Sequence, residues 1–286
     1  IVFSQLFGGG YTFLLNGYHR LPLTAFMQSF DFSSTKGWDD FYKEPGKYDS
    51  IASQDGSSTA ETATTEWHPS VSLKNISSIV PPNGRCLIIG CGNSKLPDVI
   101  LKRRDHPPPR SVVLLDTSQT CLNQLRERHL QMEGSSTNGD GQGSKVSFES
   151  TDVEYVCGDV TKLSTYFDVT SVNDSVEHDG RQNDNGGAFF DMIIDKGLTD
   201  ALLCGEGWDG PLEKLMCESA QILSKETGQY LLISYELSSS TKRFLVDVGN
   251  EVGLKWDFDF DLVKSVSQDV NVAMATNGNT PHDQHQ

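Results

Sequence analysis

Glycines and aspartates stand where short apolar runs end, at a spacing that suits the binding of a nucleotide-like cofactor. The run Arg85–Ile89 is followed by Gly90-Cys91-Gly92. Glycine lets the backbone turn sharply and approach a ligand closely because it has no Cβ. This is the pattern of the first βα turn of a Rossmann-like sheet. A dinucleotide fingerprint has a third glycine where this chain has Lys95, so the turn favours a cofactor other than a dinucleotide.

Three further apolar runs end in a carboxylate. The run from Ser111 ends at Asp116, 24 residues after Gly92 (116 − 92), which is close to the interval at which an acid binds ribose hydroxyls. The alternative is that this carboxylate caps the helix expected near Ser118. The runs 153–159 and 189–195 end in the same way. Because open α/β sheets bind ligands at the carboxyl ends of their strands, we expect one shared edge. It would carry Gly90, Asp116, Asp159 and Asp195.

Six segments in order resemble one family. The chain contains WDDFYKE from Trp38, EWH from Glu66, LIIGCGNSKL from Leu87, VVLLDTS from Val112, CGDV from Cys157 and FDMIIDKGLTDALL from Phe190. Together they resemble the class I, seven-strand S-adenosylmethionine-dependent methyltransferases, in the methyltransferase-like branch that contains the lysine methyltransferases of elongation factor 1-alpha. The missing third glycine agrees, because the turn then suits the amino-acid end of S-adenosylmethionine. The family usually reads DKGTLDAL, whereas Leu198 and Thr199 stand here in the reverse order.

The resemblance implies a role for each matched residue. Backbone groups of Gly90, Cys91 and Gly92 would approach the methionine part, Asp116 with Thr117 would bind the ribose, and Asp159 with Val160 would meet the adenine. An N-terminal segment would close over the methionine end through Trp38, Tyr42 and Trp67, and Lys196 would lie near the cofactor. Asp195 is the expected catalytic residue and would orient the acceptor amine. His68 is a further candidate base, although a lone histidine is more often structural.

The order of the elements predicts the fold class. Strands alternate with helices, such as those expected over 211–224 and 241–253, and the runs 254–263 and 270–276 form a closing antiparallel pair. The prediction is an α/β fold: a Rossmann-like, mostly parallel seven-stranded sheet with helices on both faces and a C-terminal antiparallel hairpin.

Composition divides the chain into one domain with polar additions. Residues 1–37 are expected to form a poorly ordered leader, with a remnant of an organelle-targeting peptide as the alternative. The methyltransferase domain would span 38–277, followed by a disordered tail over 278–286. Segments near 48–65, 133–151 and 168–187 are rich in small polar residues and are expected to be mobile inserts.

Charge and cysteine content narrow the partners. The net charge of −16 repels phosphate backbones, so general nucleic-acid binding is disfavoured, whereas a basic, lysine-bearing protein substrate is favoured. Six cysteines without C-x-x-C or paired Cys/His spacing indicate the reducing cytoplasm and no metal site. No apolar stretch is long enough to span a membrane. Two other functions stay open: a non-catalytic binding module on the same fold, and a nicotinamide-dependent oxidoreductase.

Overall fold

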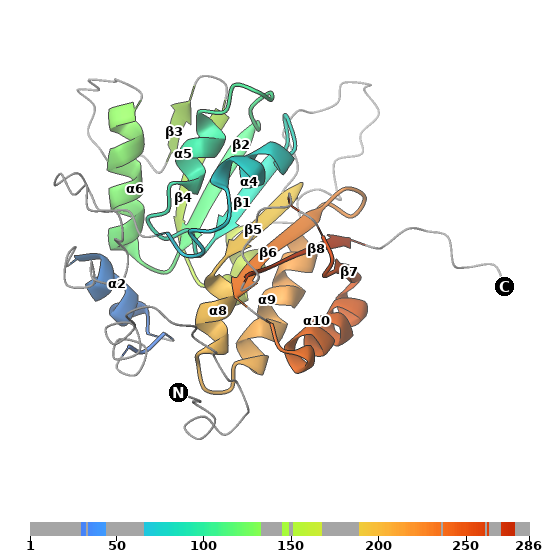
Figure 1. Ribbon diagram of the computed structural model, residues 1–286. Coiled ribbons are helices and arrows are strands. Elements are labelled where there is room, and N and C mark those ends of the chain that lie inside the picture. Colours follow the sequence, from blue (N-terminus) through green and yellow to red (C-terminus); the bar gives the residue numbers. More distant parts are fainter. Residues whose placement is uncertain are drawn as a thin grey trace.

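The computed structural model describes residues 30–32, 34–43, 66–132, 145–148, 151–167, 189–235, 237–260, 262 and 270–277 (Figure 1). The predicted tail, the inserts 48–65 and 168–187 and residues 1–29 of the predicted leader lie outside these ranges. The leader was predicted to extend to residue 37, but helix α2 (Thr35–Lys43) begins before that boundary. Phe30 and Phe32 pack their rings against Trp38 of this helix, so the folded part starts earlier than predicted.

The strands form one mixed sheet in the order β3-β4-β2-β1-β5-β6-β8-β7. Strands β4, β2, β1, β5 and β6 are parallel, β8 runs antiparallel to β6, and β7 pairs antiparallel with β8. This confirms the predicted parallel sheet with a closing hairpin. The described bounds are β1 Arg85–Ile89, β2 Ser111–Asp116, β3 Lys145–Phe148, β4 Thr151–Cys157, β5 Met192–Lys196, β6 Gln229–Tyr235, β7 Leu254–Asp257 and β8 Val270–Asn277.

Two strand predictions need correction. The segment 133–151 was predicted as a mobile insert, but β3 lies within it and adds an eighth strand antiparallel to β4. The predicted strand 254–263 ends at Asp257, because the Asp257 carboxylate accepts a hydrogen bond from the Asp259 amide (3.0 Å) and bends the chain into a turn.

Helices cover both faces of the sheet, as predicted (Figure 1). Side chains alternate along β1: Cys86 and Ile88 join one buried cluster, and Leu87 and Ile89 join the other. The first cluster includes α4 (Leu73–Ile79), α5 (Leu96–Leu101) and α6 (Gln119–Met132). The second includes η1 (Val160–Lys162), α7 (Leu163–Tyr166), α9 (Asp209–Ile222) and α10 (Ser239–Val252), and α8 (Leu198–Leu203) packs against it.

This arrangement leaves the carboxyl ends of β1, β2, β4 and β5 at one edge, where the candidate residues were expected. In the part of the chain described, no helix is long and apolar enough to cross a membrane.

Candidate functional site

The glycine turn after β1 has the backbone geometry that the sequence predicts. Gly90 and Gly92 both have positive φ, 54° and 52°, a region that disfavours residues with a Cβ. The Cys91 amide donates to the Leu115 carbonyl (3.2 Å), so the turn is fixed to β2. A Cβ on Gly90 would lie 2.9 Å from the Leu198 Cβ, which shows how closely α8 approaches the turn.

Asp116 lies at the end of β2 beside this turn. Its Oδ2 accepts from the Gly92 amide and its Oδ1 from the Ser118 amide, both at 2.9 Å. Burial raises the pKa of this carboxyl although these amides stabilise the charged form. The next residue, Thr117, shares a hydroxyl–hydroxyl hydrogen bond with Thr35 of α2 (2.9 Å). Asp116 therefore joins the glycine turn to the start of α6, so the capping alternative is present in the structure.

Helix α2 covers the turn. The Tyr42 hydroxyl lies 2.8 Å from the position of a Cβ on Gly92, and its ring stacks on Trp38 at a centroid distance of 6.4 Å. Trp38 also contacts Trp67 edge-on at 6.4 Å. The three aromatic residues predicted to close over the cofactor thus meet in one cluster.

A carboxylate on α2 fixes this cover in place. Asp39 accepts from the Ser118 hydroxyl (2.6 Å) and the Thr120 amide (3.2 Å), at the start of α6. These hydrogen bonds satisfy groups that would otherwise be unpaired at the helix N-terminus.

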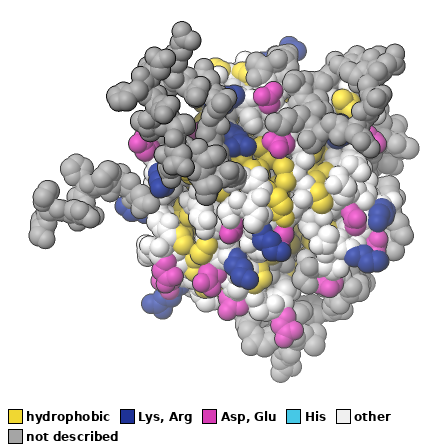
Figure 2. Space-filling view, turned by 180° about the vertical axis from the view of Figure 1, so that it is seen from behind, with side chains coloured by type: hydrophobic (Ala, Val, Ile, Leu, Met, Phe, Trp, Pro, Cys, Tyr) yellow, Lys and Arg dark blue, Asp and Glu magenta, His cyan; other side chains and the backbone are white. Residues whose placement is uncertain are grey.

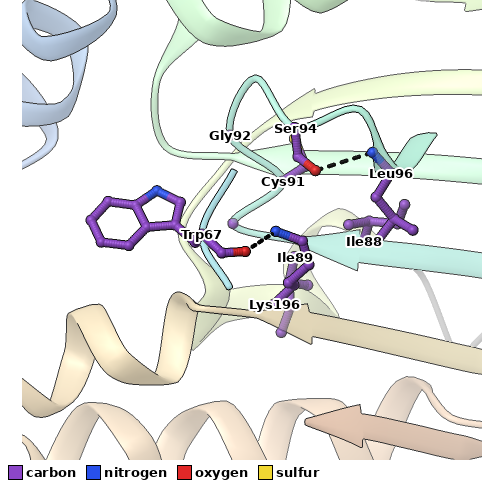
Figure 3. A pocket seen from close by; sticks show the side chains of 9 residues that line it. Trp67, Ile88, Ile89, Cys91, Gly92, Ser94, Leu96 and Lys196 are labelled. Atoms are coloured by element: carbon purple, nitrogen blue, oxygen red, sulfur yellow. Dashed lines mark hydrogen bonds between the residues drawn. The ribbon is translucent and has the colours of Figure 1, made fainter. Parts of the chain in front are cut away.

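The segment Glu66–His68 forms a second cover at the glycine turn, where Trp67 meets Trp38 of α2. Lys196, at the end of β5, pairs with the Glu66 carboxylate (3.0 Å) and donates to the Trp67 carbonyl (Figure 3). Glu66 also accepts from the Ser94 hydroxyl (2.9 Å) and the Lys95 amide. Burial lowers the pKa of the Lys196 ammonium, and Glu66 partly opposes this effect. In Figure 3 the Trp67 indole extends away from Lys196.

The space enclosed between these parts is small. The cavity at the glycine turn has a volume of about 10 Å³. Its lining contains five of the residues predicted for the cofactor site. They are Trp67, Gly90, Cys91, Gly92 and Lys196. The covers therefore fill the space beside the turn, and a cofactor can enter there only if one of them moves.

Asp195 does not have the surroundings expected of a group that orients an acceptor amine. Its side chain is fully buried, and burial raises its pKa to about 6. It accepts from the Leu198 amide (2.9 Å), the Thr199 amide and hydroxyl (3.2 and 2.5 Å) and the Tyr230 hydroxyl (3.0 Å). The carboxylate lies beneath the site and binds the first turn of α8, so its geometry is that of a structural residue.

Asp159 and Val160 follow β4, the neighbour of β2. The Gly158 amide donates to the Asp116 carbonyl (3.0 Å), which joins the two strand ends. The Asp159 carboxylate accepts from the Thr161 amide (2.9 Å) and hydroxyl (2.8 Å). Burial acts to raise its pKa, but these bonds and Lys162 outweigh it and the pKa is lowered. The Asp159 side chain is 46% exposed and remains reachable, whereas Val160 is buried.

A histidine–aspartate pair with a buried imidazole lies beside Gly197. His68 Nε2 is 2.8 Å from the Asp200 carboxylate, and the imidazole packs against the Tyr235 ring at a centroid distance of 4.3 Å. The same carboxylate accepts from the Ser234 hydroxyl. His68 has a φ of 61° and is 1% exposed, and its Nδ1 has no hydrogen-bond partner within the described ranges.

Sequence reasoning missed three residues that organise the site. Glu66 and Asp200 lie within the quoted EWH and DKGLTDALL segments, so the motifs marked them without indicating their partners. Arg128 had no such indication. It donates to the Asn93 carbonyl (3.0 Å) and the Ser94 carbonyl (2.6 Å), and these hydrogen bonds fix the backbone that follows the glycine turn.

Comparisons with known proteins give architectural likeness only. No family model matches the chain, and no curated protein matches it. Among solved structures, it is similar to the magnesium protoporphyrin IX methyltransferase from Synechocystis with bound SAM, with a TM-score of 0.47 and 10% identity over 84% of this chain and 95% of that one. A S-adenosylmethionine-dependent methyltransferase from Clostridium acetobutylicum gives a TM-score of 0.44 and 11% identity over 77% and 94% of the chains. A TehB-like SAM-dependent methyltransferase from Corynebacterium glutamicum gives a TM-score of 0.43 and 16% identity over 72% of this chain and 86% of that one. At these identities and TM-scores, cofactor and substrate have to be argued from this chain's own residues.

Proposed function

We propose that this chain is an S-adenosylmethionine-dependent methyltransferase that acts on a lysine of a basic protein. The observation that carries the proposal is the strand order combined with the glycine turn. With β3 set aside, the strands numbered in chain order lie as 3-2-1-4-5-7-6, and the seventh is antiparallel. A dinucleotide-binding Rossmann sheet ends in 4-5-6 instead. Lys95 in place of the third glycine also counts against the oxidoreductase alternative.

The hydrogen-bonding groups at the strand ends suit S-adenosylmethionine. A carboxylate accepts about four hydrogen bonds, and each oxygen of Asp116 accepts one, from Gly92 or from Ser118. Acceptor capacity therefore remains for ribose hydroxyls. Asp159 offers a second, partly exposed carboxylate at the next strand end. The methionine part would lie at Gly90 and Gly92, where Tyr42 and the Glu66–His68 segment now stand. Binding therefore requires displacement of α2 or of that segment.

The acceptor is argued from charge and from the family resemblance. A net charge of −16 attracts a basic protein and disfavours nucleic acid. The resemblance of the DKG-x-x-DAL segment to the lysine methyltransferases of elongation factor 1-alpha names the acceptor class, and a similarly basic translation protein would serve equally. We place the reaction in the reducing cytoplasm because the six cysteines lack C-x-x-C and paired Cys/His spacing.

The chain's own residues have two tasks in such a reaction. Bound S-adenosylmethionine would supply an already activated methyl group, so the protein must align the acceptor and hold it in its neutral form. We assign to His68 the role of general base, which accepts the proton that the lysine ammonium must lose. Its Nε2 hydrogen is held by Asp200, because a carboxylate only accepts, and this leaves the Nδ1 lone pair free. In this proposal the part that is displaced is α2, and the Glu66–His68 segment stays in place. His68 then keeps its contact with Asp200, Nδ1 takes the proton of a lysine ammonium, and Asp200 stabilises the resulting imidazolium.

Calorimetric titration tests the cofactor. We expect S-adenosylmethionine to bind and NAD not to bind. Asp116→Ala should weaken the affinity about tenfold or more, because the ribose loses a charged partner worth roughly 1.5–3 kcal/mol. Asp116→Asn is the companion variant: it keeps the size of the side chain, but its single oxygen can accept from only one of the two backbone amides. Preferential binding of NAD, or unchanged affinity in Asp116→Ala, would contradict the assignment.

Transfer of a radiolabelled methyl group into a cell lysate tests the acceptor. We expect the label on lysine of a basic protein, identified by mass spectrometry. Label in a small molecule or in RNA would leave the methyltransferase assignment intact and reject the protein acceptor. Cofactor binding without any labelled product would favour the non-catalytic module.

A further inference from the structure

A groove between α4 and α5 lies outside the candidate site. The two helices lie side by side in front of the sheet in Figure 1, and residues 102–106, which follow α5, contribute to the lining of the groove. Its volume is about 470 Å³, within the range of small-molecule sites. We call it the α4–α5 groove. It is lined by Lys74, Ser77, Ser78, Lys95, Asp98, Val99, Lys102, Arg103, Arg104, Asp105 and His106.

The lining is positively charged although the protein is strongly acidic. Five lysine or arginine side chains and two carboxylates line the groove, which gives a local net charge of +3 with histidine neutral, against −16 for the chain. The opposite side of the molecule mixes both signs among hydrophobic side chains (Figure 2).

Both carboxylates of the lining already have cationic partners. Asp105 pairs with Lys74 (2.8 Å), and Asp98 pairs with Arg128 (3.0 Å) outside the groove. Four cations of the lining are left without a carboxylate partner among the described residues. They are Lys95, Lys102, Arg103 and Arg104, and of these the Arg103 guanidinium donates to backbone carbonyls.

Two buried polar groups in the lining also lack partners. Ser77 is 2% exposed, and its hydroxyl makes no hydrogen bond within the described part of the chain. The same holds for the Arg103 Nε atom, whose guanidinium is fixed because Nη1 donates to the Ser77 and Val80 carbonyls, both at 2.8 Å. Buried polar groups normally have partners, and an arginine N–H can only donate. Both atoms are buried, so they are unsatisfied groups in the wall of the groove and not donors at its surface.

We infer that the α4–α5 groove binds a small phosphate-bearing ligand. A compact anion with several acceptor oxygens matches Lys95, Lys102 and Arg104, the three lining cations with neither a carboxylate nor a carbonyl partner among the described residues. The rest of the molecule disfavours a long polyanion, because phosphates that extend beyond the groove meet the field of an acidic protein. Screening over about 8 Å at physiological salt confines the attraction to the groove itself.

Titration with inorganic pyrophosphate, followed by calorimetry at low salt, tests this inference. We expect the unmodified chain to bind pyrophosphate and Lys102→Glu/Arg104→Glu to bind it at least about tenfold more weakly. The matched control is Lys214→Glu/Lys255→Glu, which makes the same charge change at exposed positions on α9 and β7. It should retain nearly full affinity. Circular dichroism and thermal unfolding of both variants separate loss of the ligand from loss of the fold.

Three outcomes would overturn the inference. They are absence of pyrophosphate binding, equal weakening in the groove and control variants, and binding of citrate or of a short single-stranded RNA more tightly than pyrophosphate. The first two reject the site, and the third rejects a small phosphate as its ligand. The result does not depend on the proposed methyl transfer, because none of these measurements involves the cofactor.

Discussion

The Tyr42 hydroxyl lies 2.8 Å from the point where a Cβ on Gly92 would stand, so α2 is in contact with the glycine turn. Two costs follow for Gly92→Ala. A residue with a Cβ at φ 52° costs about 1–2 kcal/mol, and the new methyl group collides with the phenol. We expect Gly92→Ala to lower the free energy of unfolding by more than the backbone cost alone, as measured by urea denaturation.

The double variant Gly92→Ala/Tyr42→Ala separates the two costs. It should recover the part due to the collision and not the part due to the backbone, once the loss in Tyr42→Ala alone is subtracted. If the double variant instead loses as much free energy of unfolding as the two single variants together, Tyr42 does not contact this turn.

The ion pair between Glu66 and the buried Lys196 gives a second expectation. Glu66→Gln removes the charge beside an ammonium that is only 7% exposed, and a buried charge left unpaired costs about 3–5 kcal/mol. Burial lowers the folded-state pKa of Lys196 below 10.5, and loss of Glu66 lowers it further. The unfolded chain then binds the proton more tightly, so stability rises as the pH is raised towards 10.5. Urea denaturation over this range measures the slope.

Glu66→Gln/Lys196→Met is the matched control for that experiment. It removes both charges, so it should regain most of the stability lost in Glu66→Gln and show no slope from Lys196. A double variant as unstable as the single one would indicate that Glu66 acts through Ser94 and Lys95 instead.

Asp195 should make the protein less stable as the pH rises through about 6. Burial raises its folded-state pKa to about 6 from an ordinary value of 3.8. The protonated form therefore contributes stability that is fully present below pH 3.8 and is lost as the pH rises through about 6. Asp195→Asn should remove this slope and remain folded, because the Thr199 and Tyr230 hydroxyls can accept from the new amide group. Thermal unfolding of the unmodified protein and of Asp195→Asn across this pH range measures the slope, and an unchanged slope in Asp195→Asn would assign the titration to another group.

The sequence was sufficient to place the edge of the sheet but not the direction of each side chain. Gly90, Gly92 and Asp116 could be located because glycine turns and terminal carboxylates follow apolar runs at fixed intervals. The orientation of Asp195 could not, since it depends on hydrogen bonds with Thr199 and with Tyr230, which comes from the next strand. Edge strand β3 was missed because its segment is short and lies within polar sequence.

The reversed pair Leu198–Thr199 has a structural role that the resemblance alone did not reveal. Leu198 packs against Gly90, and the buried Thr199 hydroxyl donates to Asp195 at 2.5 Å. Leu198→Thr/Thr199→Leu, which gives the order usual in the family that the sequence resembles, should remove this hydrogen bond and raise the pKa of Asp195 further. We expect the free energy of unfolding to fall by about 1–3 kcal/mol, as measured by urea denaturation. A swap that leaves stability unchanged would show that α8 accommodates either order.

His68 can be separated from the fold because its φ of 61° suits glycine. His68→Gly should therefore fold and bind S-adenosylmethionine with nearly unchanged affinity, while methyl transfer to lysine falls by a factor of about 10²–10⁴, the usual contribution of a general base. Added imidazole should restore part of the rate, because the space left by the side chain can hold it beside Asp200. Asp200→Asn is the companion variant: it keeps the contact but no longer stabilises the imidazolium, and imidazole should not rescue it. Loss of cofactor binding in His68→Gly, or a rate that imidazole leaves unchanged, would assign His68 to the structure of the Glu66–His68 segment and not to the proton.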